Sequence, residues 1–203
     1  MFNLLLPETL TDTPYHWGIV SPFIHNDIAN SLMETFPDNG FIVAEKIAGE
    51  PNDKKTYSLE TLQLEKDTPL SPIWHEFIQY LRSDQYRVRM GALIGKDLSS
   101  TMLNLTLWRY RSSQWLGPHT DKPEKIVTQI FNFNRNWSSD WGGCLRILRS
   151  DDSQDVDREI PPELNTSAIL HRSDHSWHMV TPVSDTAPVG TYRRVLTAVF
   201  ISN

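Results

Sequence analysis

The chain has few of the features that mark secreted, membrane-bound or nucleic-acid-binding proteins. Its 203 residues include a single cysteine, Cys144, which excludes an intramolecular disulfide and disfavours a cysteine-based zinc site. The net charge at pH 7 is -6, whereas general binding to nucleic-acid phosphates needs clustered lysine and arginine. The opening MFNLLLPETL has no basic stretch before its short apolar run, and Pro7 interrupts that run. We therefore expect a cytoplasmic protein with neither a signal peptide nor a membrane helix, and with no nucleic-acid or membrane partner.

The first hundred residues contain patterns typical of helices. Apolar residues recur at helical spacing from Pro22 to Phe36, and Pro37 ends the pattern. A second helix is predicted from about Ser71, as N-cap, to Leu81, and a third over residues 86–93 before Gly95. The polar stretch GEPNDKKTYS between the first two predicts a surface loop.

After Ser100 the pattern changes to short segments rich in β-branched and aromatic residues. These segments are TMLNLTLWRYR, IVTQIFNFN, GGCLRIL, TSAILHR, WHMVTPV and YRRVLTAVFI. Turn-forming residues separate them, as in an antiparallel sandwich or barrel. The acidic stretch SDDSQDVDREIPPE predicts an exposed loop. The chain length and the absence of repeats predict one α+β domain over residues 1–203, with mainly helical support in 1–100 and a β core in 101–203.

The stretch Gly117-Pro118-His119-Thr120-Asp121 has the spacing of a metal site. On extended backbone, His119 and Asp121 point to the same side, so one segment can supply two neighbouring ligands. A histidine from a distant strand would complete a facial triad of two histidines and one carboxylate, which leaves three positions open on iron(II). His171, His175 and His178 are candidates; we favour His178, because it shares a strand face with Val180, whereas His175 lies in a polar turn.

The last predicted strand, TYRRVLTAVFI, carries two arginines among apolar residues. An arginine that faces the core is costly unless an anion pairs with it, and a carboxylate can do so through two hydrogen bonds. Arg193 shares one face with Thr197, and Arg194 lies on the other face. Both faces are otherwise apolar, so alternation alone does not choose between the arginines. Tyr110, at the end of the strand before the metal segment, is a further candidate donor to an anion.

Together, these segments resemble the 2-oxoglutarate/iron(II)-dependent dioxygenase superfamily, in particular its prolyl-hydroxylase-like branch. The resemblance covers about residues 101–201 and is carried by H-x-D, then WGG-x-LR, then SWH-x-V-x-PV, then RRVLT. It implies a double-stranded β-helix, also called a jelly roll or cupin-like fold, supported by the N-terminal helices. It also implies iron(II) as metal, 2-oxoglutarate as cosubstrate and O2 as oxidant.

The resemblance also assigns residues. His119, Asp121 and His178 match the metal ligands and thus the catalytic centre, and Arg193 rather than Arg194 matches the anchor of the 2-oxoglutarate carboxylate. Leu145 and Val180 would form apolar walls of the same pocket. The remaining expected cosubstrate contacts are Tyr110, Thr128, Asn132 and Thr197, although some relatives have tyrosine at the position of Asn132.

The resemblance predicts hydroxylation of a C–H bond with release of succinate and CO2. A free amino acid or metabolite is the favoured substrate, and the alternatives are a protein or peptide residue, a non-catalytic jelly-roll binding module and a zinc hydrolase. Candidate substrate contacts are Arg109, Arg111, Trp115, Lys125, Arg146 and His171. The sequence does not identify the substrate or the oligomeric state.

Overall fold

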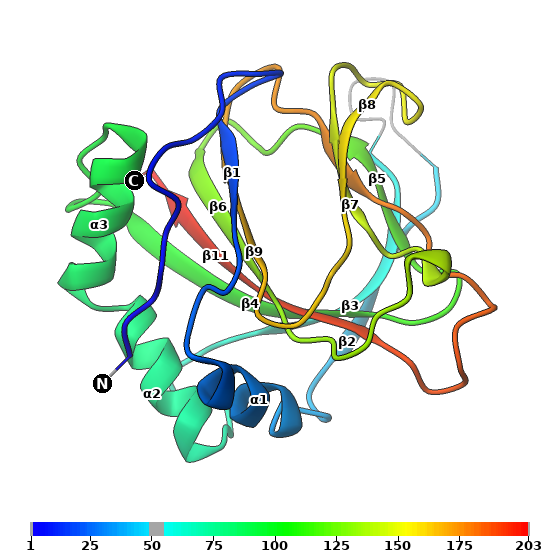
Figure 1. Cartoon of the computed structure of the whole chain (residues 1–203), viewed down its shortest axis with the longest axis horizontal. Helices are drawn as coiled ribbons and strands as arrows, with labels where there is room; N and C mark the ends of the chain where they lie inside the picture. The colour runs from blue at the N-terminus through cyan, green and yellow to red at the C-terminus, as the bar shows by residue number, and fades with distance from the viewer. Residues whose placement is uncertain (1, 49–54, 203) are drawn as a thin grey trace.

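The computed structural model describes residues 2–48 and 55–202 and shows two facing walls of antiparallel strands with helices against one of them (Figure 1). The strands follow one hydrogen-bonded order, β1-β9-β6-β11-β4-β3-β5-β10-β7-β8, and β2 pairs with β3. This arrangement confirms the predicted jelly roll. The elements are β1 (Trp17–Val20), α1 (Asn26–Glu34), β2 (Ile42–Lys46), β3 (Tyr57–Gln63), α2 (Pro72–Leu81), α3 (Asp84–Ile94), β4 (Met102–Tyr110), β5 (Trp115–His119), β6 (Lys125–Asn132), a 3-10 turn (Ser139–Trp141), β7 (Leu145–Leu148), β8 (Val156–Ile160), β9 (Ser167–His171), β10 (His178–Val180) and β11 (Arg193–Ile201).

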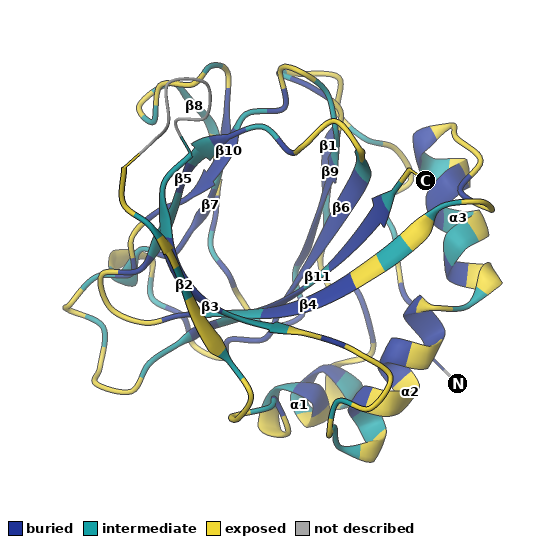
Figure 2. Ribbon diagram, turned by 180° about the vertical axis from the view of Figure 1, so that it is seen from behind, coloured by how far each residue is buried: buried dark blue, intermediate teal, exposed yellow. Residues whose placement is uncertain are grey.

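The larger wall separates an apolar outer face from a more polar inner face. Alternate residues of β4 and β11, such as Leu107 and Leu196, are buried in one cluster with side chains of the three helices, including Trp74 of α2. Because successive strand residues point to opposite faces, the residues between them face the interior of the jelly roll. Figure 2 shows the helices on the outside of this wall and the second wall, with β5, β7 and β10, on its opposite side.

The second and third predicted helices are confirmed, and the first is shorter than predicted. Helix α2 has Ser71 at its N-cap position, and α3 ends at Gly95, which has φ 66° in the left-handed region. Helix α1 begins at Asn26 rather than at Pro22, because the backbone N–H groups of residues 23 and 24 donate to Oδ1 of Asn165. Among the described residues, no helix is long and apolar enough to cross a membrane.

Four strands of the sheet lie in parts of the chain that were predicted to be helical or to form a loop. The prediction of mainly helical structure in the first hundred residues was wrong for β1, β2 and β3, and β3 lies between β4 and β5. The expected loop over residues 150–163 was also wrong in part, because β8 forms there and pairs with β7. Strand β8 lies at the end of the strand order and pairs with β7, and most of its side chains are exposed or half-buried. Of the loop predicted over residues 49–58, residues 49–54 lie outside the described part, and Tyr57 and Ser58 begin β3.

Candidate functional site

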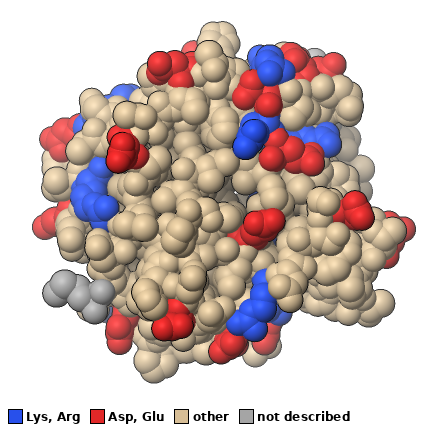
Figure 3. All heavy atoms as spheres, in the orientation of Figure 1, with Lys and Arg blue, Asp and Glu red and all other residues tan. Residues whose placement is uncertain are grey.

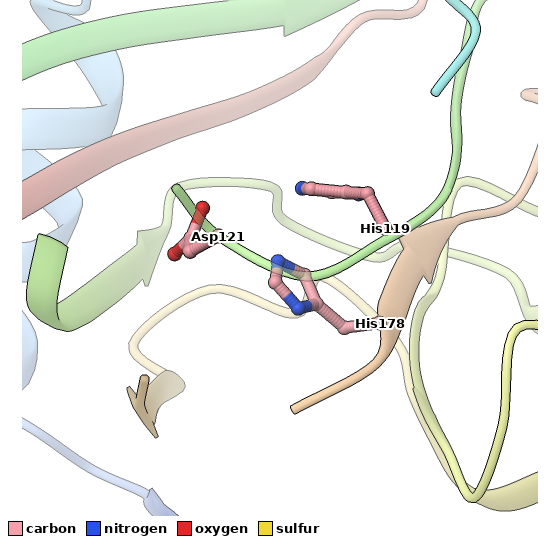
Figure 4. A group of neighbouring side chains, drawn as sticks. All are labelled: His119, Asp121 and His178. Carbon is pink, nitrogen blue, oxygen red and sulfur yellow. The ribbon is translucent and has the colours of Figure 1, made fainter. Parts of the chain in front are cut away.

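Three side chains, two from paired strands and one from the loop after β5, converge on one point (Figure 4). His119 ends β5, Asp121 follows in the next loop, and His178 begins β10. Strands β5 and β10 pair so that His178 lies directly opposite His119. One possible ligand atom from each of the three residues lies within 4.8 Å of the others, and all three residues are buried. The register of two strands therefore completes the cluster that the H-x-D spacing began.

The histidine rings are oriented by the backbone. Nδ1 of His119 lies 2.9 Å from the carbonyl oxygen of Gly117, and Nδ1 of His178 lies 2.9 Å from that of Ser176. A carbonyl oxygen only accepts hydrogen bonds, so each Nδ1 carries the proton and each Nε2 keeps a lone pair for a metal. The same arrangement at both histidines fixes two imidazole ligands in the tautomer that metal binding requires.

The charges of the cluster also suit a cation. Burial lowers the pKa of His119, and the nearby His178 and Lys55 lower it further. Burial likewise lowers the pKa of His178, although Asp121 opposes this. Burial alone would raise the pKa of Asp121, but His178, Lys125 and His119 outweigh it and hold the pKa below its usual value. At neutral pH the cluster therefore has two neutral imidazoles and one carboxylate, the protonation states that bind metals.

Both carboxylate oxygens of Asp121 accept a hydrogen bond from β6. The Nζ of Lys125 donates to Oδ1 at 2.6 Å, and Oγ1 of Thr128 donates to Oδ2 at 2.8 Å. Because Asp121 is only 7% exposed, water competes little with these donors. The carboxylate is thus held from both sides, and Thr128, predicted to contact the cosubstrate, directs its hydroxyl to Asp121 instead.

The glycine of the G-P-H-x-D segment permits a close backbone approach. The N–H of Gly117 donates to the carbonyl oxygen of Thr56 at 2.7 Å. A Cβ at this position would lie 2.8 Å from Oγ1 of Thr56 and 3.1 Å from its carbonyl oxygen. A larger residue would push away the chain that leads into β3 and disturb the register at His119.

A cavity of about 290 Å³ contains the cluster and extends along the inner face of the larger wall. Arg193 lines this cavity and is 2% exposed, with its Nε donating to the carbonyl oxygen of Gly143 at 2.6 Å. Leu145 and Val180 also line it, as predicted. The lining residues are Lys55, Thr61, Gln63, Asn104, Thr106, Trp108, Tyr110, Leu116, His119, Asp121, Lys125, Thr128, Ile130, Leu145, His178, Val180, Arg193, Val195, Thr197, Val199 and Ile201.

The two consecutive arginines point in opposite directions, which the sequence pattern left open. Arg193 faces the cavity, and its guanidinium carbon lies 5.0 Å from the ring centre of Tyr110. Arg194 lies on the outer face, 3.7 Å from a carboxylate oxygen of Asp38. Among the described residues, no carboxylate forms an ion pair with Arg193. A cation buried in this way is costly, so the cavity offers a site for an anionic ligand at this end.

Other residues predicted to contact the cosubstrate differ in what they offer. Tyr110 lines the cavity, and burial raises its pKa to about 12, so its hydroxyl stays protonated. Thr197 lines it too, but its hydroxyl accepts a hydrogen bond from Nε1 of Trp108 at 2.8 Å. Asn132 is not among the lining residues. Its Nδ2 donates to Thr166, and its buried Oδ1, which has no partner among the described groups, cannot donate to an anion.

The predicted substrate contacts are mostly on the outside of the jelly roll. Of the six predicted residues, only Lys125 lines the cavity, and the other five lie outside its lining. Arg109 and Arg111 pair with Glu60 on the outer face of β4, and Arg146 pairs with Glu159. Nε1 of Trp115 donates to Thr56, and the ring of His171 faces that of His16. Strand alternation explains this result, because each of these residues neighbours one that faces inwards.

Two lining features were missed from the sequence. Thr61 and Gln63 of β3 line the cavity beside Asn104 and Thr106 of β4, and Oγ1 of Thr106 donates to Oε1 of Gln63 at 2.8 Å. The available signal was the alternation of side chains in Tyr57–Gln63, which is typical of a strand. It was missed because this segment lies in the part of the chain that was predicted to form helices and a loop. The second missed feature is the contact of Lys125 with Asp121. The only sign of it in the sequence is that the two residues are four positions apart.

Comparisons with known proteins agree with this site. Residues 105–194 match the family model described as the 2OG-Fe(II) oxygenase superfamily. The fold is similar to that of a Pseudomonas putida prolyl-4-hydroxylase, with a TM-score of 0.67 and 16% identity over 92% of each chain. It is also similar to a Trichoplax adhaerens prolyl hydroxylase solved with a hypoxia-inducible-factor peptide, with a TM-score of 0.63 and 16% identity over 92% of this chain and 83% of that one.

A viral collagen prolyl hydroxylase from Paramecium bursaria Chlorella virus-1 has a TM-score of 0.59 and 11% identity, over 92% of this chain and 96% of that one. No curated protein sequence gave a match. The matched segment spans both paired strands of the cluster and the cavity-facing arginine. Over residues 105–194 the chain is similar to the 2OG-Fe(II) oxygenase superfamily, and this segment contains His119, Asp121, His178 and Arg193.

Proposed function

We propose that this protein hydroxylates a C–H bond of a small substrate, such as a free amino acid or metabolite, and releases succinate and CO2. The observation that carries the proposal is the shared cavity of the His119–Asp121–His178 cluster and the buried Arg193. A metal site alone serves many reactions. A metal site together with a buried cation that can hold a dicarboxylate fits a 2-oxoglutarate-dependent reaction.

The residues of the cavity fit both groups. His119, Asp121 and His178 would hold iron(II) as three ligands, which leaves positions for cosubstrate and oxygen. Arg193 would hold the far carboxylate of 2-oxoglutarate, with Tyr110 beside it. When bound, iron and 2-oxoglutarate activate O2 and supply the oxidant that replaces a substrate hydrogen with hydroxyl. Because Asp121 keeps the carboxylate ligand, no position is freed for a halide, which favours hydroxylation over halogenation.

The protein groups around the reactants have separate tasks. The carbonyl oxygens of Gly117 and Ser176 keep both imidazoles in one tautomer. The donors from β6 hold Asp121, and the buried Leu145 and Val180 limit the access of water to the metal. Exclusion of water strengthens the charge interactions in the cavity and protects a reactive oxidant from side reactions.

A second candidate function is hydroxylation of a residue within a protein or peptide. The similar folds include prolyl hydroxylases, and one of them was solved with a peptide fragment. A single side chain and a small molecule fit the same cavity equally well. Turnover of peptides without turnover of free amino acids or metabolites would favour this second candidate.

The proposal is tested by anaerobic titration with iron(II) and 2-oxoglutarate. We expect a weak visible charge-transfer band from the iron chelate, and its loss in His119→Ala and His178→Ala. His175→Ala is the matched control, because His175 is exposed in the turn before β10 and lies outside the cluster. Loss of the band in the control, with retention in His178→Ala, would contradict the assignment of the third ligand.

The turnover assay separates the remaining alternatives. We expect succinate from 2-oxoglutarate to depend on iron, O2 and a second substrate. Turnover with zinc in the absence of 2-oxoglutarate would indicate a hydrolase. A chelate band without succinate formation from any metabolite or peptide would indicate a binding module.

A further inference from the structure

The charge of the cavity differs from that of the whole chain. The chain carries a net charge of -6, and on the face in Figure 3 basic side chains lie beside acidic ones. The cavity, however, is lined by the cations Lys55, Lys125 and Arg193 and by a single carboxylate, Asp121. The described lining therefore carries more positive than negative charge.

The proposed iron and cosubstrate do not remove this excess. The two positive charges of iron(II) and the two negative charges of 2-oxoglutarate cancel. One carboxylate of 2-oxoglutarate would bind the metal and the other would pair with Arg193. Even with Lys55 left out of the count, Arg193 and Lys125 outnumber Asp121 by one positive charge. Buried or half-buried charge of one sign attracts a ligand of the other sign and selects against neutral ones.

Lys125 is the cation in a position to meet a substrate. It lies beside the metal cluster, opposite Ile201 at the far end of β11 from Arg193. Its ammonium has three N–H donors, and Asp121 accepts one of them, so two remain for a ligand. Gln63 and Asn104, which also line the cavity, are neutral, and Lys55 is the further cation near the two histidines.

We infer that the substrate carries a carboxylate, which the ammonium of Lys125 binds next to the metal. This inference rests on the proposed function and narrows its substrate. A single excess charge matches a monoanion, whereas a phosphate dianion would call for more cations and more N–H donors. The carboxylate can belong to a free amino acid or other small acid, or to an acidic residue or C-terminus of a peptide.

The test uses matched acids and amides as probes of the anaerobic protein loaded with iron(II) and 2-oxoglutarate. The common L-amino acids, their carboxamides, and end-capped peptides with and without one glutamate are titrated while the chelate band is followed. We expect at least one acid to perturb the band at a concentration about tenfold to a hundredfold below that of its amide, the usual difference for a charged hydrogen bond. Free acids and glutamate peptides distinguish the two sources of the carboxylate.

Variants then assign the preference to Lys125. Lys125→Gln removes the positive charge but keeps an N–H donor that can reach towards Asp121. We therefore expect the chelate band to form at a higher iron(II) concentration and the acid preference to disappear at saturating iron(II), and Lys125→Arg to restore most of that preference. Lys122→Gln makes the same charge change at an exposed position in the loop that precedes β6 and should behave as wild type. Thermal unfolding of each variant shows whether it is folded.

Four results would overturn the inference: equal affinity for acids and amides, an acid preference that survives in Lys125→Gln, no response to any acid, or loss of 2-oxoglutarate binding in Lys125→Gln. The last result would place Lys125 in the cosubstrate site. Failure of the proposed function is distinct, because then the wild-type protein forms no chelate band at all.

Discussion

Replacement of Arg193 by methionine should weaken cosubstrate binding strongly while changing the stability of the ligand-free protein little. The guanidinium is 2% exposed, so its pair with a ligand carboxylate would be almost fully desolvated. Removing one partner of such a pair costs about 3–5 kcal/mol, which corresponds to roughly a 100-fold to 4,000-fold loss of affinity for 2-oxoglutarate. In the ligand-free protein the substitution removes an uncompensated buried cation, which stabilises the folded state. This stabilisation offsets the loss of the hydrogen bond to Gly143, which is worth about 1–3 kcal/mol.

Thermal unfolding with manganese(II), with and without 2-oxoglutarate, measures both effects. At a concentration 100 times its Kd, the cosubstrate should stabilise the wild-type protein by about 2.7 kcal/mol, or about 5–10 °C in a chain of this size. Arg193→Met should unfold within about 4 °C of wild type without the ligand and show a ligand shift of at most about 2 °C. Arg194→Met, whose side chain faces Asp38 outside the cavity, should keep the full shift. A strongly destabilised Arg193→Met that still responds to 2-oxoglutarate would refute the assignment and make Arg193 structural.

Three further results are expected. Thr128→Val should weaken cobalt(II) binding about tenfold to a hundredfold in a spectroscopic titration, whereas Thr128→Ser should not, because only the valine removes the donor to the ligand carboxylate. The folded-state pKa values of His119 and His178 are lowered, so the unfolded chain binds more protons below pH 6.5. The metal-free protein should therefore lose stability as pH falls below 6.5, and this pair contributes at most about 2.7 kcal/mol per pH unit. Denaturant unfolding measures this slope, which should be absent from a variant with glutamine in place of both His119 and His178. Gly143→Ala should lower the unfolding free energy by about 1–3 kcal/mol, because Gly143 has φ 64°. It should also weaken 2-oxoglutarate binding, because the added Cβ would lie 3.3 Å from Cδ of Arg193. Wild-type affinity for 2-oxoglutarate in calorimetry would contradict this prediction.

Local patterns in the sequence were sufficient for much of the fold. The strands after Ser100, the cap position at Ser71 and the end of α3 at Gly95 each depend on a few neighbouring residues. The H-x-D spacing likewise fixes two ligands on one short segment. Strand β3 was missed because its alternation is short and its stability comes from pairing with β4 on one side and β5 on the other.

The sequence by itself thus determined the kind of site and its three central residues, since these follow from spacing and motif. Strand alternation alone did not decide which arginine faces the cavity, because both strand faces are apolar beyond them. The resemblance favoured Arg193, and the tertiary structure places Arg193 in the cavity and Arg194 on the outer face. It also placed Lys125 and Thr128 on Asp121 and moved most of the expected substrate contacts to the outer face. Such assignments depend on which face of each strand meets the helices and which meets the opposing wall, and residues distant in the sequence set that choice together.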